Sequence, residues 1–306
     1  MGSVSFQHTI DRIATCAGVG VHSGQKATLV LKPAPVGTGI VFERVDLSGG
    51  DRRIAARGDA VTEVMLGTTL SNVDGASVAV VEHLLAACAG MGVDNLSIEI
   101  DGPEVPIMDG SSAVFCELLM AAGLRAQAAP RRRIRILEII EVCDGVKRAT
   151  LTPSTDDWLT LRAEIDFESR AIGVQSIALR LSPGMFARDL AFARTFGFAR
   201  DVEKLQSMGL ARGGSLENAV VLDGDDVVNP EGLRARDEFI RHKALDAVGD
   251  LMLAGAPIAG VYEAVQPGHA LNNTLVRKLL QRTDAWCWEV DDFSRKGADM
   301  QVAATA

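Results

Sequence analysis

The same order of predicted elements occurs twice along the chain, and this repetition constrains the fold more than any other feature. A helix, a strand, a loop and a second helix are predicted between residues 78 and 122, and again between residues 237 and 281. Each set needs a sheet against which it can bury its apolar side chains. We therefore expect an α+β protein of two similar domains, each a helical layer packed with β-sheets, with the active site in the cleft between them.

Bulk composition excludes several classes of protein. The chain has 306 residues, 47% of them hydrophobic, which is enough for a large core and two domains. Its formal charge of −9 argues against nucleic-acid binding. The most apolar run, residues 251–265, is shorter than the ~18 residues of a membrane-spanning helix and is broken by Pro257. No stable membrane insertion is expected.

Cysteine usage and the N-terminal sequence bear on the compartment. The five cysteines contain no C-x-x-C pair, which favours a reducing compartment and makes a cysteine-rich structural zinc site improbable. The first ten residues, MGSVSFQHTI, lack the charged and apolar regions of a signal peptide. We expect a soluble cytoplasmic protein.

The first half begins with strands. Residues 4–46 alternate apolar and polar side chains between turn signals, which predicts antiparallel strands with one solvated face. The glycine-rich stretch at 18–24 predicts a turn rather than a dinucleotide site, because a strand follows it. His22 could project from that turn into a site. Farther on, AQAAP at 126–130 reads as a linker, which divides the chain into domains at 1–126 and 131–306.

The remaining predictions are single elements. The basic run after the linker predicts a strand with Ile134, Ile136 and Leu137 facing inward. Glycine closes the first helix of the first half. The helices are expected at 78–90, 111–122, near 184–193, 237–253 and 272–281, and further strands at 95–100, 134–152, 158–167 and 258–265.

The helix at 237–253 carries the strongest chemical signal. His242, Asp246 and Asp250 are spaced four residues apart, so they share one stripe of the helix. A histidine and a carboxylate one turn apart can reach the same divalent cation. The alternative is an ordinary solvated polar face, which is the commoner case for such a pair taken alone.

A second signal is the Glu82-His83 pair in an otherwise apolar helix. Neighbouring helical residues diverge by about 100°, but both can border one cavity if the helix end faces it. A buried carboxylate is costly unless it is paired or lies near a metal. The alternative is a buried ion pair with an arginine.

Together these residues form a candidate catalytic zinc site. His83, His242 and Asp246 make a set of two histidines and one carboxylate, which leaves a coordination position for water. Glu82 is then placed to take a proton from that water. His269, in a glycine-histidine loop, could act as a general acid, and Asp250 could hold it charged and oriented.

Several long motifs resemble the zinc-dependent UDP-3-O-acyl-N-acetylglucosamine deacetylases of bacterial lipid A (lipopolysaccharide) biosynthesis. The resemblance runs from HTIDRIATCAGVGVHSG near the start to GHALNNTLVRKLLQ near the end, and its motifs are at 81–112, 193–221, 237–253 and 268–273. It implies two domains, each with a small insert, one near 58–70 and one near 168–184. It also implies Zn²⁺ on His83, His242 and Asp246, with Glu82 as the base.

The resemblance assigns further roles. His269 would protonate the leaving nitrogen with support from Asp250, and Thr195 would donate its hydroxyl to the developing oxyanion. Lys243 would meet the nucleotide phosphates. The other substrate contacts it implies are Phe196 at the sugar-nucleotide pocket, Met65 and the second insert at the acyl chain, and His22. Family members often carry His-Pro shortly after the position of Phe167, whereas Glu168, Ser169 and Arg170 follow it here, so the acyl-length preference stays open.

The implied function is hydrolysis of the N-acetyl group of UDP-3-O-(3-hydroxyacyl)-N-acetylglucosamine, which releases acetate in the committed step of lipid A biosynthesis. The partner would be this small acylated UDP-sugar, and the protein would be a monomer. One alternative is a zinc hydrolase of another acylated amino sugar. Another is a non-catalytic metal-containing protein that binds a nucleotide sugar or lipid, which a fourth protein ligand at the metal would favour. The tail beyond Trp288 is expected to fray.

Overall fold

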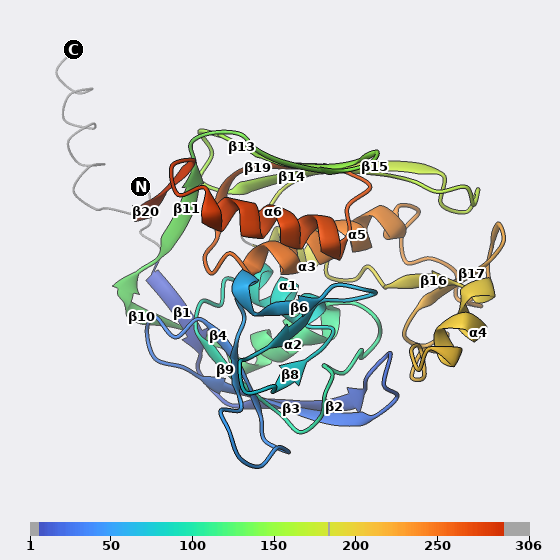
Figure 1. The fold of residues 1–306 in the computed structure, drawn as a ribbon, viewed down its shortest axis with the longest axis horizontal. Coiled ribbons are helices and arrows are strands. Elements are labelled where there is room, and N and C mark those ends of the chain that lie inside the picture. Colours follow the sequence, from blue (N-terminus) through green and yellow to red (C-terminus); the bar gives the residue numbers. More distant parts are fainter. Residues whose placement is uncertain (1–5, 183, 291–306) are drawn as a thin grey trace.

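The computed structural model describes residues 6–182 and 184–290, and these form a mixed α+β fold with several sheets. Helices lie between an upper and a lower sheet, so the molecule is layered sheet, helices, sheet (Figure 1). The α-helices of the described residues are α1 (Glu82–Met91), α2 (Ala113–Ala122), α3 (Met185–Asp189), α4 (Ala199–Ser207), α5 (Glu238–Met252) and α6 (His269–Gln281), and a 3₁₀ turn covers Gly58–Ala60.

The lower sheet is built from the first half of the chain. Its order is β2 (Ala14–Val19), β3 (Lys26–Pro33), β9 (Leu96–Ile100), β4 (Ile40–Arg44) and β5 (Arg53–Ala55). Along β3, alternate residues Ala27, Leu29 and Leu31 are buried, as the alternating pattern predicted. The sheet is mixed rather than antiparallel throughout, because β4 runs parallel to β9.

The segment predicted as a linker is a strand. β10 (Leu124–Pro130) pairs antiparallel with β1 (Phe6–Ile10), so the linker prediction for 126–130 was wrong. The small side chains of this stretch do not by themselves predict a strand. The hydrogen bonds offered by β1, more than a hundred residues earlier in the chain, determine its conformation.

The upper sheet has seven strands. Its order is β12 (Ile140–Asp144), β13 (Lys147–Thr152), β19 (Ile258–Val265), β11 (Arg132–Ile136) and β20 (Trp286–Val290), while β14 (Leu159–Asp166) pairs with β19 and β15 (Val174–Arg180) pairs with β14. Ile134 and Ile136 of β11 are buried as predicted, but Leu137 follows the strand and is 50% exposed. The inward prediction for Leu137 was therefore wrong.

Two small three-stranded sheets stand apart from the large ones. One comprises β6 (Val61–Glu63), β7 (Thr69–Ser71) and β8 (Ser77–Val78), and begins within the insert expected near 58–70. The other comprises β16 (Phe196–Phe198), β17 (Val220–Asp223) and β18 (Asp226–Val227). The range near 168–184, where the second insert was expected, contains β15, which belongs to the upper sheet.

The turn between β14 and β15 contacts the second small sheet. Ser169 donates a hydrogen bond from Oγ to the carbonyl oxygen of Gly224 at 2.7 Å. Arg170 pairs through Nε with Asp225 Oδ2 at 2.6 Å. Ser169 and Arg170 thus hold this turn against the turn between β17 and β18.

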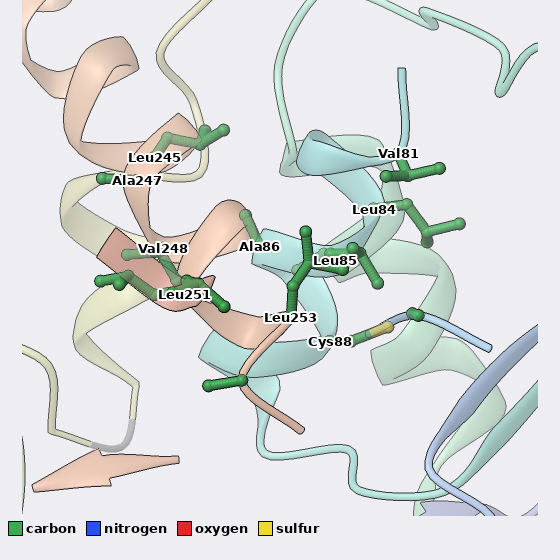
Figure 2. Packing of buried hydrophobic residues seen from close by; sticks show 14 of the residues in the cluster. Val81, Leu84, Leu85, Ala86, Cys88, Leu245, Ala247, Val248, Leu251 and Leu253 are labelled. Carbon is green, nitrogen blue, oxygen red and sulfur yellow. The ribbon is translucent and has the colours of Figure 1, made fainter. Parts of the chain in front are cut away.

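Helices α1 and α5 cross in the middle of the molecule, where apolar side chains from both helices form a continuous core (Figure 2). Their approach is close because Gly249 of α5 faces the backbone of Glu82. A Cβ atom at Gly249 would lie 2.1 Å from the Glu82 carbonyl oxygen, which no side chain could tolerate. Glycine at this position therefore allows α5 to lie directly against the start of α1.

The helix starts differ from those predicted. α1 begins at Glu82 rather than residue 78, because Val78 completes β8 and Ala79 bridges to Glu104. It ends at Met91 and is capped by Gly92, which has φ +75°, whereas Gly90 lies within the helix and packs against Phe186. Helix α5 matches its predicted range closely, with Asp237 and Leu253 as its flanking residues.

Two further helices and the C-terminal end of the described chain also differ from what the sequence predicted. Helix α6 begins at His269, three residues before its predicted start, with Gly268 as its extended N-cap. The helix expected near 184–193 is reduced to the five residues of α3. Glu289 and Val290 belong to β20, and the rest of the tail that was expected to fray lies outside the described residues.

Candidate metal centre and active site

The fold brings His83, His242 and Asp246 together, although they come from two helices far apart in the sequence. His83 lies in the first turn of α1, and the other two face it from α5 one turn apart. Asp246 Oδ1 lies 3.6 Å from His83 Nε2 and 3.3 Å from His242 Nε2. The three side chains are buried, and their candidate ligand atoms lie within 4.8 Å of one another.

The chemistry of this set fits a divalent metal ion. Asp246 Oδ1 is buried without a hydrogen-bond partner among the described residues, although it faces two histidine nitrogens. An uncompensated buried carboxylate oxygen is costly, and a cation at this point would satisfy it. Zinc accepts two imidazoles and one carboxylate and leaves further positions open.

The protonation states of the ligands also suit a metal. Burial lowers the pKa of His242 to about 3, so its imidazole is neutral at physiological pH. His242 Nδ1 then donates a hydrogen bond to the Ala193 carbonyl oxygen at 3.1 Å, which leaves Nε2 free to face the metal position. Burial alone would raise the pKa of Asp246, but the neighbouring His242 and Lys243 hold it well below its usual value.

Glu82 lies beside this set at the start of α1. Its Oε2 accepts a hydrogen bond from the Thr68 backbone N–H at 2.9 Å, and its Oε1 lies 3.7 Å from His269 Nε2. No arginine pairs with Glu82 in the described part of the chain, so the buried arginine pair considered above was wrong. Burial raises the pKa of Glu82, as a general base at neutral pH requires.

His269 and Asp250 form the other side of the site. Asp250 is buried and lies 3.0 Å from His269 Nδ1 through Oδ2. Burial would lower the pKa of His269, but the charges of Asp250 and Glu82 outweigh it and raise that pKa to about 10. The imidazole is therefore protonated at neutral pH and can act as an acid through Nε2.

Sequence reasoning missed the residues that hold Asp250. Thr68 donates from Oγ1 to Asp250 Oδ1 at 2.7 Å, and Asn272 donates from Nδ2 to Oδ2 at 2.9 Å. Asn273 adds a longer contact of 3.4 Å to Oδ1. The two asparagines stand three and four residues after His269 on α6, so their helical spacing was a usable signal. Thr68 had none, because it reaches the site from the loop that immediately precedes β7.

Lys243 and Phe196 line the same region. Lys243 Nζ lies 3.1 Å from Asp246 Oδ2 and 5.6 Å from the centre of the Phe196 ring. The Phe196 ring in turn packs against the His242 ring, with centroids 6.2 Å apart. Both side chains therefore border the metal set.

Thr195 is half-buried and is held by its backbone. Its N–H donates to the Gly110 carbonyl oxygen at 2.8 Å, and its own carbonyl accepts from Val220 N–H at 2.8 Å. It stands two residues after Ala193, whose carbonyl contacts His242. The described residues show no hydrogen bond from the Thr195 hydroxyl.

Met65 and His22 lie at the loop between β6 and β7 of the first small sheet. Met65 is 52% exposed on the loop between β6 and β7. His22 Nε2 donates to the Leu66 carbonyl oxygen at 2.9 Å, and Ala211 N–H donates to His22 Nδ1 at 3.4 Å. His22 therefore joins the first insert to the segment after α4.

A cavity of about 810 Å³ lies at the opposite ends of the same helices, lined by residues such as Gly90, Phe186 and Met252. None of the residues of the metal set lines it. Among the described residues, no helix is long and apolar enough to span a membrane. All five cysteines are within the described residues and are free thiols.

Comparison with known proteins decides the family. Residues 7–281 match the family described as LpxC: UDP-3-O-acyl N-acetylglycosamine deacetylase. A UDP-3-O-acyl-N-acetylglucosamine deacetylase of Phenylobacterium zucineum (strain HLK1) is 54% identical over 281 residues, which is 92% of this chain and 95% of the relative. The chain belongs to the UDP-3-O-acyl-N-acetylglucosamine deacetylase family.

Other relatives of the same name agree over the same span. The protein of Myxococcus xanthus (strain DK1622) is 52% identical over 290 residues, covering 95% of this chain and 90% of the relative. That of Shewanella frigidimarina (strain NCIMB 400) is 47% identical over 298 residues, covering 97% and 96%. Deacetylases of this family are zinc-dependent enzymes of lipid A biosynthesis, which confirms the enzyme class, the function and the cofactor that the sequence resemblance implied.

Proposed function

We propose that this protein hydrolyses the N-acetyl group of UDP-3-O-(3-hydroxyacyl)-N-acetylglucosamine and releases acetate. One observation carries the proposal: a buried His-His-Asp set with an unpaired carboxylate oxygen stands beside a buried glutamate and a histidine that faces two further carboxylates. Metal-assisted amide hydrolysis needs a metal site, a base and an acid close together.

His83, His242 and Asp246 would hold zinc, which when bound polarises the acetyl carbonyl and lowers the pKa of water towards ~7. Every other step falls to side chains. Glu82 Oε1 takes the proton from the attacking water, while the Thr68 N–H keeps Oε2 fixed. His269 Nε2 gives its proton to the amine as the tetrahedral adduct collapses, and Asp250 holds that imidazole charged.

We assign substrate contacts to the side chains around these groups. Thr195 donates its hydroxyl to the oxyanion, supported by a backbone that is fixed at both N–H and carbonyl. Lys243 meets the diphosphate, and Phe196 borders the sugar nucleotide beside His242. Met65 contacts the acyl chain from an exposed position on the first insert, and His22 contributes from the insert's edge.

We infer two domains, 1–126 and 131–306, which meet at the site because Glu82 and His83 come from one and His242 and Asp246 from the other. The first insert is β6–β8. We place the second insert at β16–β18 with α4, and not near 168–184, because β15 is part of the upper sheet. Five free cysteines support a reducing, cytoplasmic location, and we expect a monomer.

Glu82→Gln tests the proposal. The amide cannot accept a proton, so we expect kcat on the 3-O-acylated UDP-sugar to fall by ~10²–10⁴-fold while zinc content stays near that of the unaltered protein. Glu43→Gln, which removes a carboxylate that pairs with Arg52 on the lower sheet, is the matched control and should keep its activity. Full turnover by Glu82→Gln would refute the base assignment.

The choice of substrate is measured separately. The unaltered protein is assayed with the 3-O-acylated sugar and with UDP-N-acetylglucosamine that lacks the acyl chain. A strong preference for the acylated sugar supports the proposal. Comparable efficiency on both would favour a hydrolase of another amino sugar, and zinc binding without turnover would favour a binding protein.

A further inference from the structure

Residues 192–195 form a short segment in which successive backbone groups are held from different directions. Arg234 Nη1 donates to the Phe192 carbonyl oxygen at 2.9 Å, and His242 Nδ1 donates to that of Ala193 at 3.1 Å. The Thr195 N–H donates to Gly110 at 2.8 Å. Within this segment Ala193 therefore contacts His242, a proposed metal ligand, and Thr195 is the proposed oxyanion donor.

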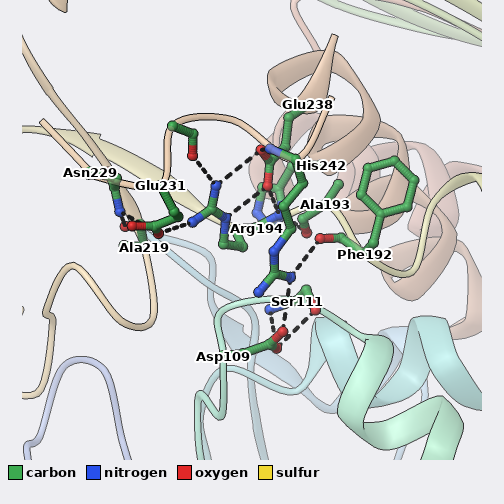
Figure 3. A network of polar contacts seen from close by, with 12 residues as sticks. Asp109, Ser111, Phe192, Ala193, Arg194, Ala219, Asn229, Glu231, Glu238 and His242 are labelled. Atoms are coloured by element: carbon green, nitrogen blue, oxygen red, sulfur yellow. Dashed lines mark hydrogen bonds and ion pairs between the residues drawn. The ribbon is translucent and has the colours of Figure 1, made fainter. Parts of the chain in front are cut away.

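The residue between Ala193 and Thr195 is Arg194, whose side chain is buried. Arg194 is 2% exposed and its main partner, Glu238, is 0% exposed. Arg194 donates to Glu238 Oε1 from Nε at 2.9 Å and from its own backbone N–H at 3.0 Å. Figure 3 shows this pair beside His242, with Glu231 and Asn229 on the other side of Arg194.

The remaining donors of the guanidinium are also satisfied. Nη2 donates to the Gly232 carbonyl oxygen at 2.7 Å, and Nη1 pairs with Glu231 at 2.6 Å. Glu238 Oε2 accepts a further bond from the Arg234 N–H at 2.6 Å. The planar fork of arginine is matched at each nitrogen, which lysine could not reproduce.

Glu238 stands four residues before His242 on α5, so the two side chains share one face of that helix. The ion pair thus fixes the 192–195 segment to the same helix that carries His242 and Asp246. Any shift of Arg194 would move the Ala193 carbonyl on one side and Thr195 on the other. A buried ion pair is weak evidence for stability alone, since apolar residues of similar volume often serve as well.

We propose that Arg194 and Glu238 are positioning residues, which set the Ala193 carbonyl to orient the His242 imidazole and set Thr195 to face the reacting acetyl group. This inference rests on the metal ligands of the proposed function. Partners that orient a ligating histidine typically change metal affinity or activity by ~10–100-fold when they are altered.

Arg194→Lys and Glu238→Gln test the proposal, with Arg44→Lys as the matched control. Arg44 is also buried and also binds a carboxylate with two nitrogens, through Nε and Nη2 to Asp46 at 2.8 and 2.7 Å, but it lies on β4 of the lower sheet. Zinc affinity is measured by chelator competition, and the geometry at the metal by the visible absorption of the Co²⁺-substituted proteins.

We expect Arg194→Lys and Glu238→Gln to weaken zinc binding by ~10–100-fold and to lower kcat more than they change KM. Their Co²⁺ spectra should shift, and that of Arg44→Lys should not, even if all three variants melt at a lower temperature. Glu238→Gln keeps the shape of the side chain and carries the test if Arg194→Lys does not fold.

The two proposals fail in different ways. If the unaltered protein bound no zinc, the metal assignment itself would be wrong. If it bound zinc and both variants kept its zinc affinity, Co²⁺ spectrum and kcat, the Arg194–Glu238 pair would be structural only, and the positioning role would be overturned.

Discussion

Two buried carboxylates, Glu82 and Asp250, face the same histidine but occupy different surroundings. Glu82 accepts one backbone hydrogen bond and lies 3.7 Å from His269 Nε2. Asp250 is surrounded by donors, with Thr68 and Asn272 bonded to its two oxygens. This difference fits the two proposed roles, because protein donors hold both oxygens of Asp250 against His269, whereas Glu82 Oε1 faces the site without a hydrogen-bond donor among the described residues.

These surroundings predict a bell-shaped pH dependence of kcat/KM. Burial raises the pKa of Glu82, and only its ionised form is a base, so activity should fall as the pH drops through that raised pKa. His269 has its pKa raised to about 10 and acts in its protonated form, so activity should fall as the pH rises through that value.

Asp250→Asn is the sharpest test at the residue scale. It removes the nearest of the three negative charges that raise the pKa of His269, so the alkaline limb should move to lower pH by ~1–3 units, with a lower maximum. The measurement is kcat/KM against pH at constant ionic strength. An alkaline limb that does not move would show that another group titrates there.

At the scale of elements, helix α5 was predictable and the start of α1 was not. The apolar period and the four-residue spacing of His242, Asp246 and Asp250 located α5 to within a residue at each end. The apolar run at 78–81 was predicted as helix from its side chains. In the structure Val78 ends β8 and Ala79 forms a β-bridge with Glu104, so pairing with neighbouring chain outweighs the local pattern. β10 escaped prediction because its partner β1 is remote in the sequence.

The close contact between α1 and α5 can be tested by adding a side chain at Gly249. Gly249→Ala would place a methyl group 2.1 Å from the Glu82 carbonyl oxygen, so α5 must move away from α1. We expect a loss of unfolding free energy of ~1–3 kcal/mol or more, and weaker zinc binding, because the ligands on the two helices separate. Denaturant unfolding and chelator competition measure the two effects.

Gly214→Ala is the control for that substitution, because a Cβ there would meet only ordinary contacts, with the nearest atom 3.6 Å away. Its stability and zinc affinity should match those of the unaltered protein. A Gly249→Ala protein with unchanged stability would mean that the helices can separate without cost, contrary to the packing in Figure 2.

For the molecule as a whole, the sequence predicted the mixed α+β class and the repeated element order, but not which strands share a sheet. Thr68 could not be predicted as a site residue for the same reason. The small sheet that contains β7 brings it to Asp250. His242 and Asp246 were predicted from their spacing and His83 from the Glu82-His83 pair in an apolar helix, but the packing of α1 against α5 that brings the three together was not predicted. Tertiary contact, not local pattern, supplies that arrangement.

The buried His-His-Asp set is the proposed position of the catalytic zinc. The most direct measurement is metal content together with deacetylase activity on the 3-O-acylated UDP-sugar, before chelation, after it and after zinc is restored. We predict about one zinc per chain, loss of activity on chelation and its return with zinc. Full activity in the metal-free protein would contradict the account.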